Sequence, residues 1–193
     1  NVYVTGRSQG TGTGMDYVTI KYSSSGIIQW IQRYDYNGGE DEAADITIDT
    51  LNNIYVTGSS RSTLNDEIDF ATIKYNSSGV RQWVQRYTGL ANENDYAEKI
   101  AVDKSGNVYV TGSSFESGIL SDITTIKYNS GGIAQWVRQY DGPSGSNDRP
   151  SCILVDNSGS VYVAGYSTGI GTQGDYTTIK YNSSGLQLWE QRD

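Results

Sequence analysis

The sequence predicts an all-β protein built as a tandem array of four-stranded antiparallel units. Marker residues return along the chain at a fixed interval of 53 residues, which is the signature of a repeat architecture. Each interval contains short runs rich in Val, Ile, Thr, Tyr and Trp, the residue types enriched in strands. No stretch repeats apolar residues with helical spacing over helical length.

The repeat is clearest in four sets of residues. They are Trp30, Trp83, Trp136 and Trp189; Lys21, Lys74, Lys127 and Lys180; Asp16, Asp69, Asp122 and Asp175; and Gly26, Gly79, Gly132 and Gly185. The intervals predict units at about residues 1–40, 41–93, 94–146 and 147–193, here called units 1 to 4. We expect them to form one domain over residues 1–193, as a fragment of a longer chain.

The third unit illustrates the four expected strands, which we letter A to D in chain order. They are "AEKIAVD" (Ala97–Asp103), "NVYVTGSS" (Asn107–Ser114), "ITTIKYN" (Ile123–Asn129) and "IAQWVRQY" (Ile133–Tyr140). The tight turns are "DKSGN" between A and B and, in the second unit, "NSSG" between C and D. Asn or Asp accepts hydrogen bonds within such a turn, and Gly takes the left-handed position of a bulged hairpin. We therefore expect positive φ at Gly26, Gly79, Gly132 and Gly185.

A four-stranded unit repeated in tandem at this period is typical of a β-propeller blade. The pattern "GNVYVTGSS…D.TTIKYNS.G..QW" resembles the bacterial β-propeller repeat family abbreviated SBBP. The resemblance implies secreted or surface proteins of bacteria, often beside adhesion-type modules, with no family-wide enzymatic activity. The family name implies seven blades, whereas this chain carries fewer than four full units.

The first unit lacks one strand. The strand A pattern occurs three times, as "AADITID", "AEKIAVD" and "PSCILVD", and the chain opens directly at strand B of unit 1. Strand A is expected to be the innermost strand of a blade, so the edge "NVYVTG" has no neighbour, and exposed edges recruit partners. We expect further blades of the same protein, the other end of a ring, or another chain to fill the gap.

Composition excludes several classes of function. Lys plus Arg number 14 against 22 Asp plus Glu, which gives a net charge of −8 and disfavours nucleic acid as a partner. No apolar run approaches the ~20 residues of a membrane span. Histidine is absent, which removes the commonest general base and the usual zinc ligand. Cys152 is the single cysteine, so no internal disulfide can form.

The repeated ionic residues admit two interpretations. They could form a ring of acid and base groups, or a structural network that holds one unit to the next. We favour the network, because a catalytic site needs one asymmetric constellation. In that network we expect Lys to lay its stem on Trp or Tyr and to pair its ammonium group with Asp.

Acidic loops raise the question of calcium. Asp41, Asp95 and Asp148 open the A strands, and Glu40, Glu42, Glu93, Asp66 and Glu67 lie nearby in sequence. Oxygen-rich loops can hold Ca²⁺, but no "D-x-[DN]-x-[DN]-G" run is present. Neighbouring carboxylates on a loop are usually solvated. We therefore expect no cofactor, with Ca²⁺ as the alternative.

The segments that differ between units are the B–C and D–A connections, which propeller geometry places on one face. The uniform A–B and C–D turns share the other face. Function commonly resides on variable loops over a rigid frame. Arg61, Phe115 and Tyr166 are the side chains there most suited to anchoring a partner. Neutral drift of surface loops is the alternative.

These observations predict a non-enzymatic scaffold or binding module, extracellular or at the cell surface, with a protein or glycan partner. One alternative is a polysaccharide-acting enzyme or a lectin domain with a carboxylate site. The enzyme would need two carboxyl groups ~5 to 9.5 Å apart across a cleft. A further alternative is a purely structural repeat that assembles through its open blade edges.

Overall fold

The computed structural model describes residues 1–193 except 65, 90, 92, 116–119 and 172–173. Among the described residues there are fifteen strands and no helix. The strands are β1 (Val2–Gln9), β2 (Met15–Tyr22), β3 (Ile28–Tyr34), β4 (Asp41–Ile48), β5 (Ile54–Arg61), β6 (Ile68–Tyr75), β7 (Arg81–Tyr87), β8 (Asp95–Val102), β9 (Val108–Phe115), β10 (Ser121–Tyr128), β11 (Ala134–Tyr140), β12 (Asp148–Val155), β13 (Val161–Ser167), β14 (Asp175–Tyr181) and β15 (Gln187–Arg192).

These strands form four antiparallel sheets in which neighbours follow chain order. Unit 1 contains β1-β2-β3, and the other units contain β4 to β7, β8 to β11 and β12 to β15. The all-β fold class and the three-stranded first unit are therefore confirmed. The four strands expected in the third unit correspond to β8, β9, β10 and β11.

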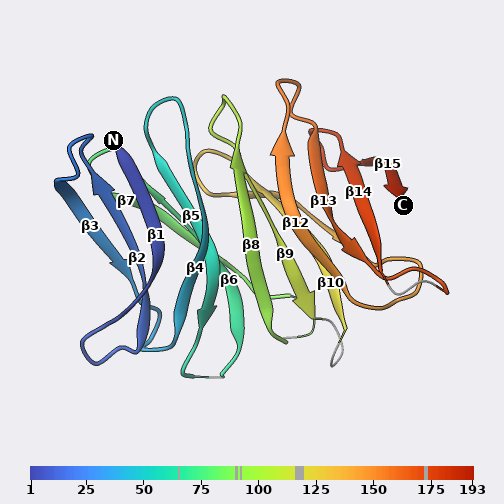
Figure 1. The fold of residues 1–193 in the computed structure, drawn as a ribbon, viewed down its shortest axis with the longest axis horizontal. Helices are drawn as coiled ribbons and strands as arrows, with labels where there is room; N and C mark the ends of the chain where they lie inside the picture. Colours follow the sequence, from blue (N-terminus) through green and yellow to red (C-terminus); the bar gives the residue numbers. More distant parts are fainter. Residues whose placement is uncertain (65, 90, 92, 116–119, 172–173) are drawn as a thin grey trace.

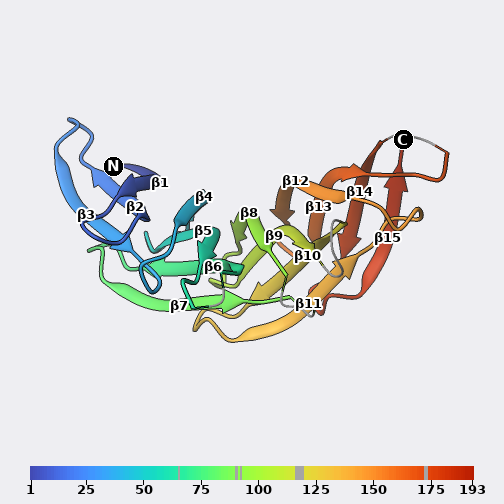
Figure 2. The same cartoon turned by 90° about the horizontal axis from the view of Figure 1, so that it is seen from below.

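The sheets pack face to face along an open arc. Figure 2 shows β4, β8 and β12 on the inner, concave side and β7, β11 and β15 on the outer side. In Figure 1 the A–B and C–D turns lie at the upper edge of the array, here called the turn edge. The B–C and D–A connections lie at the lower edge, here called the loop edge. The division of uniform and variable segments between two faces is thus as expected.

The C–D turns have the backbone that their sequence predicts. The φ angles of Gly26, Gly79, Gly132 and Gly185 are 79°, 83°, 85° and 81°, so the prediction of positive φ is confirmed. In unit 2 the Asn76 side-chain oxygen accepts hydrogen bonds from the backbone N–H groups of Ser78 and Val80, both at 3.0 Å. This Asn-to-Gly turn lets strand C pass directly into strand D.

The A–B turns use Asp in the same way. In unit 3 the Asp103 carboxylate accepts hydrogen bonds from the backbone N–H groups of Ser105 and Asn107, at 2.8 and 2.9 Å. It also accepts the hydroxyl of Tyr109 at 3.0 Å. Burial opposes ionisation of Asp103, but the hydrogen bonds from Asn107, Tyr109 and Ser105 outweigh it and lower the pKa of the carboxyl.

The core lies between the sheets rather than within one of them. In the cluster that joins units 3 and 4, Tyr109, Ile123, Trp136 and Tyr140 pack against Ile153, Val161, Val163, Ile179 and Tyr181. Units 1 and 2, and units 2 and 3, share clusters built from largely equivalent positions. Each unit therefore buries its apolar faces only by stacking on a neighbour, as in other repeat proteins.

The A strands share one irregularity in their pairing with the B strands. Each A strand carries a β-bulge at an equivalent position, between Ala43 and Asp45, Ala97 and Lys99, and Pro150 and Cys152.

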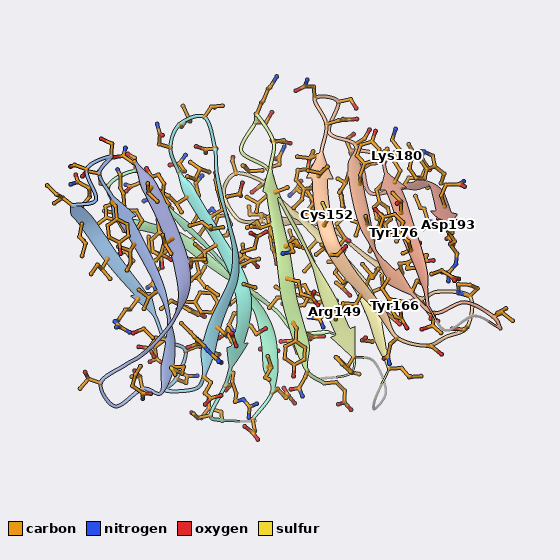
Figure 3. The ribbon with its side chains drawn as sticks, viewed as in Figure 1. Arg149, Cys152, Tyr166, Tyr176, Lys180 and Asp193 are labelled. Atoms are coloured by element: carbon orange, nitrogen blue, oxygen red, sulfur yellow. The ribbon has the colours of Figure 1, made fainter. Side chains whose placement is uncertain are left out.

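Cys152 is an exposed free thiol on β12 (Figure 3). Within the part of the chain that the structure describes, no helix has the length and hydrophobicity to cross a membrane.

Candidate functional site

A row of Tyr, Lys and Trp crosses each sheet near the turn edge. In unit 2 the register pairs Tyr55 with Lys74, and Lys74 with Trp83. The Lys74 ammonium nitrogen lies 5.2 Å from the centre of the Tyr55 ring. The Tyr55 and Trp83 rings are 6.2 Å apart. The lysine stem thus lies between two aromatic side chains, and its ammonium group is placed over the Tyr55 ring.

The Lys and Trp of one unit bind the C–D turn of the next. The Lys74 Nζ and Trp83 Nε1 atoms both donate to the backbone carbonyl of Ser130, at 3.1 and 3.2 Å. The Trp83 ring also lies 6.2 Å from the ring of Tyr128, in the strand before that turn. Lys21 and Trp30 bind the Ser77 carbonyl, and Lys127 and Trp136 bind the Ser183 carbonyl, in the same way. We call the Lys and Trp side chains that donate to one turn carbonyl in this way a Lys–Trp pair.

The turn glycine is part of this junction. A β-carbon built on Gly132 would lie 2.9 Å from Trp83 Cδ2, closer than a real β-carbon approaches. The indole therefore packs directly on the turn backbone. One segment of about a dozen residues thus performs two tasks, because it closes its own hairpin and receives the Lys–Trp pair of the preceding unit. This double task accounts for its near-identical repetition.

The repeated Asp of strand C pairs with arginine instead of lysine. The ion pairs are Asp16–Arg33 at 3.5 Å, Asp69–Arg86 at 2.6 Å and Asp175–Arg192 at 3.0 Å, each within one unit. The expected Lys–Asp pairing is wrong. Asp and Lys stand an odd number of residues apart on strand C, so they point to opposite faces of the sheet. In unit 3 the position of the arginine holds Gln139.

The Asp residues that open the A strands are fully buried. Asp41, Asp95 and Asp148 each accept a backbone N–H of the preceding D–A connection, from Tyr36 at 2.9 Å and from Gly89 and Gly142 at 2.5 Å. The interpretation of these carboxylates as solvated loop groups is therefore wrong. Burial raises the pKa of Asp41 to about 6, and it also raises the pKa of Asp95 and of Asp148.

Three carboxylates meet where units 3 and 4 join. Oxygens of Asp122, Asp141 and Asp148 lie within 4.8 Å of one another. Two other acidic residues considered for calcium are ion-paired, since Asp66 contacts Arg61 at 3.0 Å and Glu42 contacts Arg7 at 2.9 Å. Among the described residues this cluster is where a hard cation would find oxygen ligands. Binding of Ca²⁺ stays the alternative to the expectation of no cofactor.

Arg61, Phe115 and Tyr166 each line one of three adjoining hollows. Arg61 lines a hollow of about 90 Å³, Phe115 one of about 400 Å³ and Tyr166 one of about 580 Å³. The first two hollows share Glu42, Ser59 and Tyr96, and the last two share Glu98 and Arg149. We call this continuous surface, on β4, β8, β12 and the strands beside them, the inner groove. In Figure 3 Arg149, Tyr166 and Tyr176 mark its end in unit 4.

The groove lining alternates charged pairs and aromatic rings. Arg149 Nε lies 3.0 Å from Glu98 Oε1, and Ser113 donates its hydroxyl to the same carboxylate at 2.8 Å. The Tyr96 and Phe115 rings are 6.1 Å apart in an edge-to-face arrangement. The rings of Tyr166 and Tyr176 are exposed at the end of the groove. Such a lining offers hydrogen bonds and stacking surfaces together.

Sequence reasoning missed half of this groove. Glu98, Arg149 and Tyr96 lie on β8 and β12, the A strands, and not in the variable loops. A signal was present, because the residue after the buried Asp of strand A differs in each unit: Glu42, Tyr96 and Arg149. Variation at this position, directly after an Asp that all three A strands share, indicates a surface that is free to recognise a ligand.

Four-stranded antiparallel meanders that stack side by side along an arc define the class of protein: an array of β-propeller blades. The model of the SBBP β-propeller repeat family matches residues 29–64, 82–116 and 135–172, which is more than half of the chain. The chain belongs to this family, as its resemblance predicted. Each matched segment runs from strand D of one unit through strands A and B of the next, across a junction. No curated protein matched the sequence.

Proposed function

We propose that the chain is a non-enzymatic scaffold and binding module, acting outside the cell or at the cell surface, whose binding surface is the inner groove. One observation carries the proposal. The uniform Lys, Trp and turn residues are used to hold successive units together, whereas the residues that differ between units line one continuous surface. Variable side chains on a rigid frame are the usual form of a recognition surface.

The chemistry of the groove favours a glycan as ligand, with an extended peptide as the second candidate. The exposed faces of Tyr166 and Tyr176 can stack on the C–H faces of sugar rings. The Arg149–Glu98 pair beside them supplies donors and acceptors for hydroxyl groups. The net charge of −8 weighs against a nucleic acid.

The distribution of carboxylates supports binding over hydrolysis. A glycoside hydrolase needs two accessible carboxyl groups, one of them with a raised pKa. The carboxyls for which burial raises the pKa are Asp41, Asp95 and Asp148, and these are buried beneath the D–A connections. In the groove, Glu98 is held by Arg149 as an ion pair.

A glycan and peptide binding screen tests the proposal. We expect the whole chain to bind a subset of polysaccharides, with affinity reduced about tenfold or more in Arg149→Ala and in Tyr166→Ala. Arg81→Ala removes an equally long cation at the start of the outer strand β7 and serves as the matched control. Affinity that is equal in all three variants would contradict the site. Release of reducing ends from a bound polysaccharide would contradict the non-enzymatic role.

The location is tested separately in cells that produce the protein. We expect an added protease or antibody to reach it on intact cells or in the medium. Detection only after the cells are lysed would contradict an extracellular role.

A further inference from the structure

The hollow that Tyr166 lines, here called the unit 4 hollow, contains one lysine without a counter-ion. Its charged side chains are Glu98, Lys99, Arg149 and Asp175. Glu98 is paired with Arg149, and Asp175 is paired at 3.0 Å with Arg192, which does not line the hollow. Within the described part of the chain, no carboxylate forms an ion pair with Lys99. The hollow therefore has one uncompensated positive charge.

Lys99 occupies a position that unit 2 uses for a bond across a junction. The residue there is Asp45, whose Oδ2 atom accepts the backbone N–H of Ile100 in unit 3 at 3.0 Å. An ammonium group has no acceptor, so Lys99 cannot make the equivalent bond to unit 4. Both residues lie at the β-bulge of their strand, a distortion that re-aims side chains next to binding sites. The lysine therefore remains free to bind a ligand in the hollow.

Arg149 is held in place through only one of its nitrogens. Its Nε atom lies 3.0 and 3.1 Å from the two carboxylate oxygens of Glu98. Ser113 holds the same carboxylate through its hydroxyl group, at 2.8 Å. Among the described residues, the terminal Nη1 and Nη2 atoms of Arg149 have no acceptor, and the side chain is 72% exposed. Glu98 thus orients a guanidinium group whose outer fork can still bind a carboxylate.

The ring of Tyr166 lies beside these cations on a seat found only in unit 4. Arg149 and Tyr166 are register partners on β12 and β13. The Tyr166 ring lies against Gly174, where an added β-carbon would overlap the ring. The residue at this place in the other units is Met15, Ile68 or Ser121. A ring that is supported in this way and is 47% exposed can stack on a sugar.

We propose that the unit 4 hollow recognises a uronic acid residue of a glycan. The sugar carboxylate binds Lys99 and the outer fork of Arg149, and the sugar ring stacks on Tyr166. This inference rests on the proposed function of the inner groove and names the class of sugar that the groove selects. One uncompensated cation matches one carboxylate, whereas the net charge of −8 disfavours a dense row of them. The ligand is a glycan in which neutral sugars separate the uronic acids.

Hyaluronate and glucuronoxylan are the probes that test the proposal. Each is compared with a form in which its uronic acids have been reduced to neutral sugars, by calorimetric titration of the whole chain. We expect at least one of the two polymers to bind about tenfold more tightly than its reduced form. Lys99→Gln lowers the affinity for that polymer by about tenfold, since it loses one charge-assisted contact, and leaves the affinity for the reduced form unchanged. Lys99→Arg keeps the preference for the acidic polymer.

Lys104→Gln is the matched control. Lys104 is an exposed lysine in the A–B turn of the same unit and does not line any of the three hollows of the inner groove. The control removes the same charge as Lys99→Gln, and we expect it to bind the acidic polymer as the unmodified chain does. Circular dichroism checks that each variant is folded, and Lys99→Met replaces Lys99→Gln if the latter is not.

The outcomes separate this inference from the proposed function. Equal affinity for the acidic and reduced polymers, or equal losses in Lys99→Gln and Lys104→Gln, would overturn the uronic acid. If Arg149→Ala and Tyr166→Ala then still weaken binding of a neutral glycan, the proposed function of the groove stands. Failure to bind any polysaccharide would overturn the glycan for the groove as well. Tighter binding of poly-glutamate than of either polymer would identify an acidic peptide as the occupant and overturn the sugar.

Discussion

The turn edge and the loop edge of this array are built on the same strands but differ in what their residues do. At the turn edge, one turn sequence recurs four times and receives a Lys–Trp pair at all three internal junctions. At the loop edge, each unit has its own residues, and the ion pairs differ from one hollow to the next. A change at the turn edge disturbs a packed junction between two units, whereas a change in the groove alters an exposed contact on the surface. The difference explains why one edge is uniform and the other is variable.

The two edges also place their carboxylates in opposite environments. At the turn edge, hydrogen bonds from the turn lower the pKa of Asp49, Asp103 and Asp156, in the last case to about 2. Burial works against this shift at Asp49 and Asp103 and is outweighed there. At the loop edge, burial raises the pKa of Asp41, Asp95 and Asp148. Solvated turns therefore keep Asp ionised, while the buried starts of the A strands favour the neutral form.

The largest expected loss of stability follows from a substitution at the turn edge. Trp83→Ala removes an indole that packs on Gly132 and Tyr128 and donates to the Ser130 carbonyl. We expect the free energy of unfolding to fall by about 3–5 kcal/mol, the usual cost of removing a large core aromatic side chain. Denaturant titration measures the change. A loss below about 1 kcal/mol would show that the junction does not stabilise the fold.

A pair of glycine variants separates turn strain from junction packing. Gly79 and Gly26 have φ angles of 83° and 79°, so alanine is strained similarly at both, by about 1 kcal/mol or more. Only at Gly79 would the added β-carbon also meet an indole, that of Trp30 at 2.9 Å. We expect Gly79→Ala to lower the free energy of unfolding by about 1–2 kcal/mol more than Gly26→Ala does. Equal losses would contradict close packing of the indole on the turn.

The buried Asp41 at the loop edge makes the stability of the fold depend on pH, in a direction set by its raised pKa. The pKa of Asp41 is about 6 in the folded protein and 3.8 as its ordinary value, so the folded state holds the proton more tightly. Stability contributed by this group is present at low pH and is lost as the pH rises through about 6. We expect the difference in unfolding free energy between the unmodified chain and Asp41→Asn to change by about 2 kcal/mol between pH 4 and 7. A flat difference would contradict the raised pKa.

The smallest expected effect on stability lies in the inner groove. Arg149 is exposed and makes a surface ion pair with Glu98. Such pairs contribute roughly 0–1 kcal/mol, so we expect Arg149→Ala to change the unfolding free energy by less than about 1 kcal/mol. Thermal and denaturant unfolding provide the measurement. A loss comparable with that of Trp83→Ala would mean that the groove is structural, and the contrast between the two edges would fail.

The sequence was sufficient for the parts of the fold that depend on local pattern. Strands, turn glycines and the missing strand of unit 1 follow from alternation, turn chemistry and a fixed period, all of which act over a few residues. The pairing of Lys74 depends on which face of the sheet it shares with Tyr55 and on the approach of Ser130 from another unit. A list of repeated residues does not carry that information, and the expected Lys–Asp pairing failed for this reason.

The candidate site was only partly predictable. Arg61, Phe115 and Tyr166 were expected in the variable loops; they lie instead on β5, β9 and β13, and all three line the groove. That Arg149 lies beside Glu98 depends on the packing of β12 against β8, two strands from different units. Burial of Asp41 likewise depends on how the D–A connection folds over strand A. Such contacts are set by the stacking of units, which the sequence of a single unit does not specify.

Hydrogen exchange at the four indole Nε1–H groups is the most direct test of the junctions that hold this array together. Trp30, Trp83 and Trp136 donate to carbonyls of the following unit at 3.2–3.3 Å, whereas the ring of Trp189 lies at the open end of the stack. In a dilute, monomeric sample followed by nuclear magnetic resonance, we predict three slowly exchanging indole signals and one fast signal from Trp189. Four signals with the same fast exchange, or a Trp189 as protected as the others, would contradict the junctions described here.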